Sequence, residues 1–131
     1  FKAFSPRTRI VGVSAVNSAA LAASIRAGHY VEVTHSDTLA DGCAGGIDEA
    51  SITLPLGTEV IDDLIDCTED QIADGLRHLA WTEKMLVEGS AGLAQAAWQA
   101  DASKRKDKVS AVILCGANFD RDRIAPIIAS Q

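Results

Sequence analysis

The sequence of 131 residues has an excess of negative over positive charge and few aromatic side chains. Twelve Lys and Arg residues against eighteen Asp and Glu residues give a net charge of −6 at pH 7. Because no basic stripe is present, the composition argues against a nucleic-acid-binding protein. No apolar run approaches the length of a membrane-spanning helix, and no signal peptide is evident. We therefore expect a cytoplasmic protein that binds neither nucleic acid nor a membrane.

Cysteine and histidine are also scarce, with three residues of each. Cys43, Cys67 and Cys115 are odd in number and form no C-x-x-C pair, and the histidines occur singly. This arrangement predicts neither a disulfide framework nor a zinc site. The apolar fraction of 47% and the charged fraction of 23% are ordinary for a globular protein, and the length suits one domain with its own core.

Strand-like and helix-like segments alternate along the chain. Apolar or alternating runs predict strands at residues 9–14, 30–34, 64–67 and 109–114. The last of these runs is apolar enough to be a strand buried on both faces. Helix formers and capping residues predict helices at residues 19–27 and 51–63, from Thr68, at residues 90–100, and from Asp120 or Asp122. The sequence thus predicts an α/β fold, a three-layer sandwich with a mostly parallel sheet.

Several residues mark the ends and the faces of these helices. Gly28 ends the first helix, and Pro55 is tolerated only near the first turn of the second. Thr68 and Gln71 form a capping box before the third helix. Apolar residues at helical spacing predict its buried face: Ile72, Leu76, Leu79, Ala80 and Leu86. The glycine-containing stretch 37–46 predicts a long loop, and long loops in compact domains are often functional.

Two motifs of small residues point to a ligand site. One is Val-Glu-Gly-Ser-Ala-Gly at residues 87–92, and the other is Cys-Gly-Ala-Asn at residues 115–118, after the apolar run. Ligands in open α/β sheets bind beyond the carboxyl ends of the strands. Glycine lets the backbone approach a flat or anionic ligand closely. The two motifs therefore predict a binding site at this edge of the sheet.

The residue types in these motifs leave alternatives open. Cys115 is an inert small hydrophobe, a nucleophile, or a neutral hydrogen-bond partner for a ring nitrogen. Glu88 either faces water at a helix end or is partly buried, and the apolar residues before it favour burial. Asp41 and Gly42 form an ordinary turn on the simplest interpretation.

Four motifs in order resemble one known enzyme family. They are Leu-Ala-Asp-Gly at 39–42, Thr-Glu-Asp-Gln-Ile at 68–72, Glu-Gly-Ser-Ala-Gly at 88–92, and Cys-Gly-Ala-Asn at 115–118. Together they resemble the carboxyl-terminal part of the serine/threonine dehydratases, which are pyridoxal-phosphate enzymes of fold type II, the tryptophan-synthase-β-like fold. The stretch 76–89 further resembles the branch linked to hydroxyectoine utilisation.

The resemblance implies roles for five residues. Cys115 matches the position whose hydroxyl or thiol hydrogen-bonds the pyridine nitrogen, where serine is commoner. Gly116 and Asn118 would shape the turn beside the ring. Glu88 matches a carboxylate near the cofactor ring, and Gly42 matches a backbone contact on the substrate-facing side. A neutral partner at the nitrogen leaves the ring a moderate electron sink, which suits β-elimination.

Other parts of the family pattern are missing from this sequence. The lysine that forms the Schiff base, the substrate-carboxylate loop and the glycine-rich phosphate loop lie upstream in the family. We therefore expect residues 1–131 to be the carboxyl-terminal part of a large cofactor-binding domain, a fragment of a longer chain that is inactive alone. Its partner would be the missing amino-terminal part, and a homodimer is expected by analogy. Some relatives bind a metal through acidic residues after the first strand, where this chain has Ser14, Ser18 and Ala19; no metal is predicted.

The implied activity is a β-elimination that converts threonine or serine into a 2-keto acid and ammonia. A racemase of the same fold is one alternative. Another is a non-catalytic ligand-binding or regulatory domain that keeps the scaffold without the chemistry. A dinucleotide-binding domain is disfavoured, because no G-x-G-x-x-G motif follows the first strand.

Overall fold

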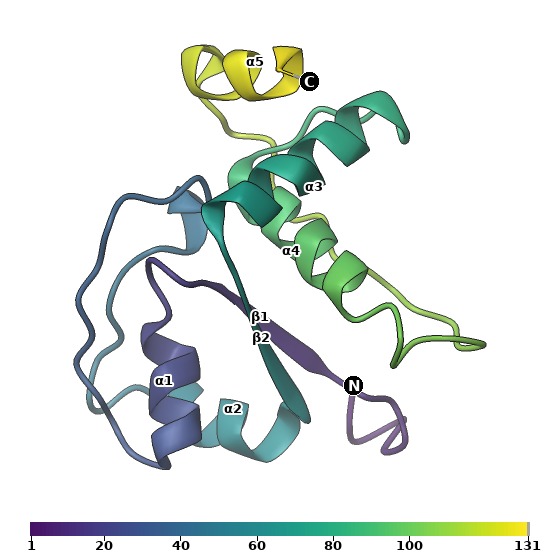
Figure 1. Ribbon diagram of the computed structural model, residues 1–131. Helices are drawn as coiled ribbons and strands as arrows, with labels where there is room; N and C mark the ends of the chain where they lie inside the picture. The colour runs from purple at the N-terminus through teal and green to yellow at the C-terminus, as the bar shows by residue number, and fades with distance from the viewer. Residues whose placement is uncertain (131) are drawn as a thin grey trace.

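The computed structural model describes residues 1–130. Its elements, in chain order, are β1 (Val11–Ala15), α1 (Ala20–Ala27), η1 (Asp41–Cys43), α2 (Thr53–Val60), β2 (Asp63–Cys67), α3 (Glu69–Trp81), α4 (Gly89–Ala100) and α5 (Arg121–Ala129). Figure 1 shows α1 and α2 on one side of the sheet, with α3 and α4 on the other. The α/β architecture with a parallel sheet is confirmed.

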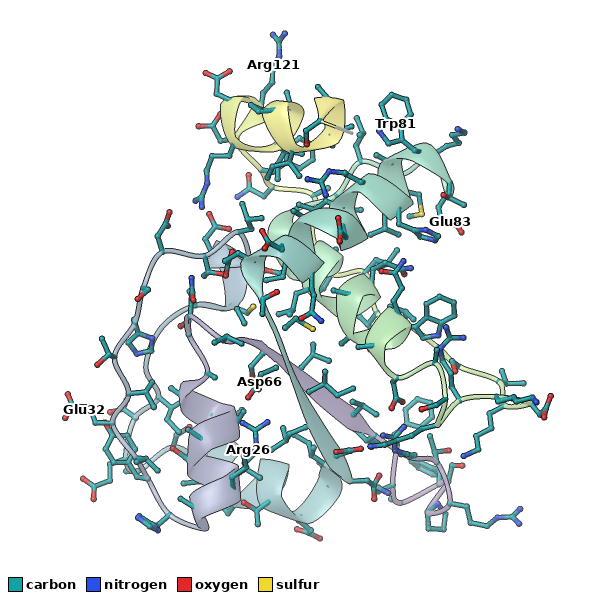
Figure 2. The ribbon with its side chains drawn as sticks, in the orientation of Figure 1. Arg26, Glu32, Asp66, Trp81, Glu83 and Arg121 are labelled. Atoms are coloured by element: carbon teal, nitrogen blue, oxygen red, sulfur yellow. The ribbon has the colours of Figure 1, made fainter. Side chains whose placement is uncertain are left out.

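The sheet consists of β1 and β2, which pair in parallel from Val11 opposite Asp63 to Ala15 opposite Cys67. Small and branched residues bury the carboxyl ends of both strands against α3 and α4. The core cluster there comprises Ala15, Ala40, Cys67, Ile72, Leu93, Ala96 and Ala97. On the other side, Arg26 of α1 points toward Asp66 of β2, and their ion pair measures 2.6 Å (Figure 2).

Helices α3 and α4 pack closely through glycine. The Thr68 side chain accepts a hydrogen bond from the Gln71 amide and the Gln71 side chain reaches back, so the expected capping box starts α3. A Cβ on Gly75 of α3 would overlap the backbone carbonyl of Gly92 in α4. This close approach leaves the first turn of α4 beside the loop that carries η1.

A second core cluster holds α5 against the end of α3 and the start of α4. It comprises Leu76, Leu79, Val87, Ala91 and Ile124. Asp120 caps α5, because its side chain accepts a hydrogen bond from the Asp122 amide. Two side chains of α3 also bind the backbone of α5: Arg77 Nε donates to the Ile127 carbonyl at 3.1 Å, and Trp81 Nε1 donates to the Ile128 carbonyl at 2.9 Å.

Two of the expected strands are wrong. Residues 109–114 have no regular secondary structure, no strand among residues 1–130 pairs with them, and Val109 and Ile113 are exposed by 104% and 77%. Cys115, expected at the end of a buried strand, is consequently exposed as well. Residues 30–34 also form no strand: the Val31 amide donates to Ser24 Oγ of α1 at 3.0 Å instead of joining a ladder.

Two helix boundaries also differ from expectation. Leu86 is not on the buried face of α3, because the helix ends at Trp81 and Lys84 takes a positive φ of 60° that turns the chain. Leu86 is therefore 60% exposed. The second helix ends at Val60, before Asp63 begins β2, and Pro55 does lie in its first turn. The stop at Gly28 is confirmed, with φ 75° in the left-handed region.

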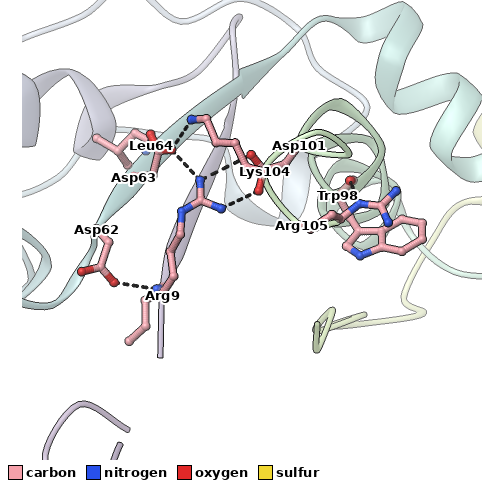
Figure 3. A network of polar contacts seen from close by, with 9 residues as sticks. Arg9, Asp62, Asp63, Leu64, Trp98, Asp101, Lys104 and Arg105 are labelled. Carbon is pink, nitrogen blue, oxygen red and sulfur yellow. Dashed lines mark hydrogen bonds and ion pairs between the residues drawn. The ribbon is translucent and has the colours of Figure 1, made fainter. Parts of the chain in front are cut away.

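A network of ion pairs lies at the amino end of the strands (Figure 3). Arg9 donates to Asp63 of β2 and to Asp101 at the end of α4, each at 2.5 Å, and Lys104 contacts Asp63 at 2.6 Å. Hydrogen bonds from Lys104 and then Arg9 lower the pKa of Asp63 to about 2. The same carboxylates raise the pKa of Arg9. The network joins α4 to the sheet far from the two motifs.

Candidate functional site

The centre of the candidate site is the Glu88 carboxylate, which lies between two glycines. Glu88 precedes α4 with an extended backbone, and its side chain is half-buried, as the sequence predicts. A Cβ on Gly42 would lie 2.8 Å from Glu88 Oε1 and 2.9 Å from Ser90 Oγ. A Cβ on Gly116 would overlap the Glu88 carboxylate. Any larger residue at either glycine would therefore displace this carboxylate.

Glu88 also fixes the turn formed by residues 115–118. Its Oε2 accepts a hydrogen bond from the Asn118 amide at 3.0 Å, and its own amide donates to the Gly116 carbonyl at 3.4 Å. Gly116 has a φ of 96°, in the region that only glycine adopts without strain. The turn thus needs both the glycine and the carboxylate.

Two thiols flank this carboxylate. Cys115 precedes Gly116, and Cys43 follows Gly42 with its Sγ 3.3 Å from the Ala40 carbonyl. Burial raises the pKa of Cys43; a contact with the Ser90 hydroxyl opposes that shift, and Cys115 and Glu88 add to it. Cys43 and Cys115 thus lie on the two segments that meet at the Glu88 carboxylate. No pattern in the sequence points to Cys43 as a site residue, since only the fold brings the 37–43 loop to Glu88.

Ser90, in the first turn of α4, carries the one polar side-chain atom of this cluster that is buried without a hydrogen bond among residues 1–130. The residue is 7% exposed. A buried hydroxyl without a partner is uncommon, since its desolvation is uncompensated. Its neighbours are Gly42 and the Cys43 thiol, so it is a polar group on the Gly42 side of the site.

The loop of residues 37–43, which carries Gly42, is held by side chains of α3, of α5 and of the segment after β1, and by the backbone of α4. Glu69 of α3 accepts a hydrogen bond from the Leu39 amide at 2.7 Å, and Asn17 donates to the Asp37 carbonyl at 2.7 Å. Gly89 of α4 packs on the loop so closely that a Cβ there would overlap the Leu39 carbonyl. The loop is therefore a fixed wall of the site.

Arg123 of α5 is a further anchor of this loop, and sequence reasoning missed it. Its Nη2 donates to the Thr38 carbonyl at 2.9 Å, and its Nη1 donates to Asp41 Oδ2 at 3.0 Å. These contacts join positions more than 80 residues apart, so no local pattern could reveal them. The only sequence signal was an arginine shortly after the second motif.

All five residues predicted for the site meet in one place. They come from three segments that meet at the Glu88 carboxylate: Gly42 and Gly116 lie against it, the Asn118 amide donates to it, and Cys115 directly precedes Gly116. The lysines lie elsewhere: Lys2, Lys84 and Lys104, for example, contact Asp62, the Trp81 carbonyl and Asp63. Among residues 1–130, no three His, Cys, Asp or Glu side chains are grouped as a metal site requires. No helix in the same span is long and apolar enough to cross a membrane.

Comparison with known proteins identifies similar sequences. A Sinorhizobium fredii protein assigned to the threonine dehydratases is 36% identical over 120 residues, which are 91% of this chain and 36% of that protein. The L-threonine ammonia-lyase of Thermotoga maritima is 30% identical over 127 residues, covering 97% of this chain and 31% of the relative. The chain thus spans about a third of the length of these curated relatives.

Solved structures give the same picture. The processed form of threonine deaminase isoform 2 from Solanum lycopersicum matches with a TM-score of 0.86 and 27% identity, over 100% of this chain and 39% of that one. Maize serine racemase matches with a TM-score of 0.80 and 26% identity, over 95% and 39%. The family described as pyridoxal-phosphate dependent enzyme matches residues 1–116, and this chain belongs to that family.

Proposed function

We propose that this chain forms one wall of the active site of a pyridoxal-phosphate-dependent ammonia-lyase. The reaction eliminates the β-hydroxyl of threonine or serine as water and takes up one water again by hydrolysis, so the net products are a 2-keto acid and ammonia. The observation that carries the proposal is the meeting of Glu88, Gly42 and the 115–118 turn in one place. Similarity to threonine dehydratases and threonine deaminase supports the choice of reaction.

The residues present fit one side of the cofactor. Gly42 and Gly116 bring backbone directly against the Glu88 carboxylate, and the buried Ser90 hydroxyl lies beside Gly42. Cys115 is exposed next to them. A flat ring is approached closely by backbone that carries no side chains, with a few polar groups at its edge. The lysine and phosphate loop of the complete site would come from sequence that the longer relatives have and this chain does not.

Pyridoxal phosphate supplies an electron sink for the bonds at the substrate α-carbon when it is bound. The Cys115 thiol would donate a hydrogen bond to the ring nitrogen without transferring its proton, so this nitrogen would not be fully protonated. The Glu88 carboxylate would keep the 115–118 turn in place through the Asn118 amide. The Gly42 backbone would line the side that faces the substrate. A moderate sink favours rapid loss of the β-hydroxyl over a long-lived carbanion.

The test uses the protein encoded by the complete reading frame that contains this sequence. A visible absorption band that borohydride abolishes, together with keto acid and ammonia from L-threonine, is the expected result. Inversion of the α-carbon of L-threonine without formation of keto acid would favour a racemase over a lyase. Absence of the band with added cofactor would refute the proposal and favour a non-catalytic ligand-binding domain.

Substitutions at Cys115 test its role directly. Cys115→Ser keeps a neutral hydrogen-bond donor, so we expect a bound cofactor and retained lyase activity. Cys115→Asp would favour a protonated ring nitrogen, so we expect a lower elimination rate with the cofactor still bound. Equal activity of the two variants would contradict the proposed role of this thiol. Serine as a second substrate, the resemblance to the hydroxyectoine branch, the homodimer and the cytoplasmic location remain predictions.

A further inference from the structure

Arg123 connects the last helix to the loop that carries Gly42. Its guanidinium donates to the Thr38 carbonyl at 2.9 Å and to Asp41 Oδ2 at 3.0 Å, and Asp37 lies 3.6 Å away. The ion pair with Asp41 is largely exposed and contributes little by itself. The bond to Thr38 counts for more, because this residue is only 3% exposed and its carbonyl would otherwise be left without that partner.

The contact acts on a loop whose position decides the shape of the site. Gly42 directly follows Asp41 and lies against Glu88 and Ser90 with no room for a Cβ. Helix α5, which carries Arg123, begins a few residues after the 115–118 turn. Arg123 therefore ties the two segments of the candidate site together from outside, while Glu88 joins them from inside.

We propose that Arg123 is a positioning residue for the substrate: it holds residues 38–42 so that the Gly42 backbone keeps its place on the substrate-facing side. This inference rests on the proposed function. Arg123 does not touch the reacting atoms in this assignment. Its effect passes through the Thr38 carbonyl and the Asp41 carboxylate to Gly42.

A purely structural role makes a different prediction. Arg77 also holds α5, since its Nε donates to the Ile127 carbonyl at 3.1 Å and to Ser130 Oγ at 3.2 Å, but it contacts α5 from α3 rather than the loop. If Arg123 only fastens α5, then loss of Arg77 should have the same consequences. Arg121, at the start of α5, points away from the rest of the molecule (Figure 2) and serves as a neutral control.

The experiment compares Arg123→Met, Arg123→Lys, Arg77→Met and Arg121→Met in the full-length cofactor-loaded protein. Steady-state kinetics with L-threonine give kcat and KM, the visible band reports cofactor occupancy, and thermal unfolding reports stability. Arg123→Met removes the hydrogen bonds of a charged guanidinium, so we expect KM to rise about tenfold and kcat to change less. The visible cofactor band should be retained. Arg123→Lys keeps the positive charge but loses the planar guanidinium that donates to two acceptors, so its KM should lie between those of the parent and Arg123→Met. Arg77→Met should lower the unfolding temperature and leave KM unchanged, and Arg121→Met should change neither.

Three outcomes overturn the inference. An active parent with an unchanged KM in Arg123→Met overturns the inference and leaves the proposed function intact. An equal rise in KM in Arg77→Met assigns Arg123 to the fastening of α5 alone. A parent protein without a cofactor band or keto acid formation refutes the proposed function, and the positioning role fails with it.

Discussion

Two segments without regular strand or helix over most of their length supply the backbone of the candidate site, and they differ in how they are held. The loop of residues 37–43 is fixed by Glu69, Asn17 and Arg123 and by the close approach of Gly89. The segment 109–118 is fixed at its end, through the Glu88 contacts, while Val109 and Ile113 are exposed. One side of the site is therefore set by many polar contacts within the chain, and the other by few.

The largest expected effect comes from breaking the contact between α4 and the better-held loop. Gly89→Ala would drive a methyl group into the Leu39 carbonyl, which is backbone and cannot rotate away. We expect a loss of about 3 kcal/mol in the free energy of unfolding, at the upper end of the usual overpacking range. Urea unfolding of the purified protein measures it.

Gly46→Ala is the matched control for that variant, because the nearest atom to its added Cβ would be His35 Nε2, 3.9 Å away. It should unfold at the parent urea concentration. Similar urea midpoints for the Gly89 and Gly46 variants would show that the 37–43 loop moves to accommodate the methyl group, and would contradict its firm attachment.

Cysteine alkylation compares the two segments in the unmodified protein. Burial raises the pKa of Cys67 to about 11, and partial desolvation raises the pKa of Cys43, although the Cys43 side chain is exposed. Because the thiolate is the nucleophile, Cys67 should react with iodoacetamide at pH 8 at least about a hundredfold more slowly than the exposed Cys115. Cys43 should fall between them. Site-resolved mass spectrometry over time gives the three rates, and equal rates at Cys43 and Cys115 would mean that the loop is as open as the 109–118 segment.

Glu88→Gln weakens the attachment of the less well-held segment. The charged acceptor for the Asn118 amide becomes a neutral one, which predicts a loss of about 1 kcal/mol in local stability. Hydrogen exchange at the Asn118 amide should accelerate by several-fold. Glu83→Gln, an exposed change in the turn after α3, is the control and should leave this amide unaffected. Unchanged exchange in Glu88→Gln would mean that other contacts hold the turn.

The smallest effect is expected far from both segments, in the ion-pair network around Asp63. The folded pKa of Asp63, about 2, lies below the ordinary aspartate value of 3.8, so this stabilisation is present above about pH 4 and is lost as the pH falls toward 2. Because these side chains are partly exposed, the contribution is at most about 1 kcal/mol. Lys104→Met should reduce the pH dependence of urea unfolding between pH 4 and pH 2. Lys106→Met, an exposed change nearby, should preserve it.

Features set by local physics could be predicted from the sequence. The Thr68–Gln71 capping box, the left-handed Gly28 and the half-buried Glu88 depend on residues within a few positions, and all three are confirmed. The family resemblance also grouped Glu88 with the 115–118 turn before any geometry was known. The roles assigned to these residues remain predictions.

Features set by distant partners could not be predicted. The apolar run 109–114 has the composition of a buried strand, but a strand needs a neighbour, and no strand among residues 1–130 supplies one. Residues 30–34 likewise pair with no strand, and the Val31 amide donates instead to the Ser24 side chain of α1. The Arg123 contacts with Thr38 and Asp41 leave no trace in any window of sequence, because the partners are brought together only when α5 packs.

The parallel pairing of β1 with β2 also has a kinetic consequence. Val11 pairs with Asp63, so the chain must close a long loop before the first ladder hydrogen bond forms, whereas α3 and α4 are neighbours along the sequence. Loop closure opposes early pairing of distant segments. We expect the α3–α4 hairpin to form in the folding transition state and the strand pair to follow it. Substitutions in the helix pair should then slow folding, and substitutions in β1 should mainly speed unfolding.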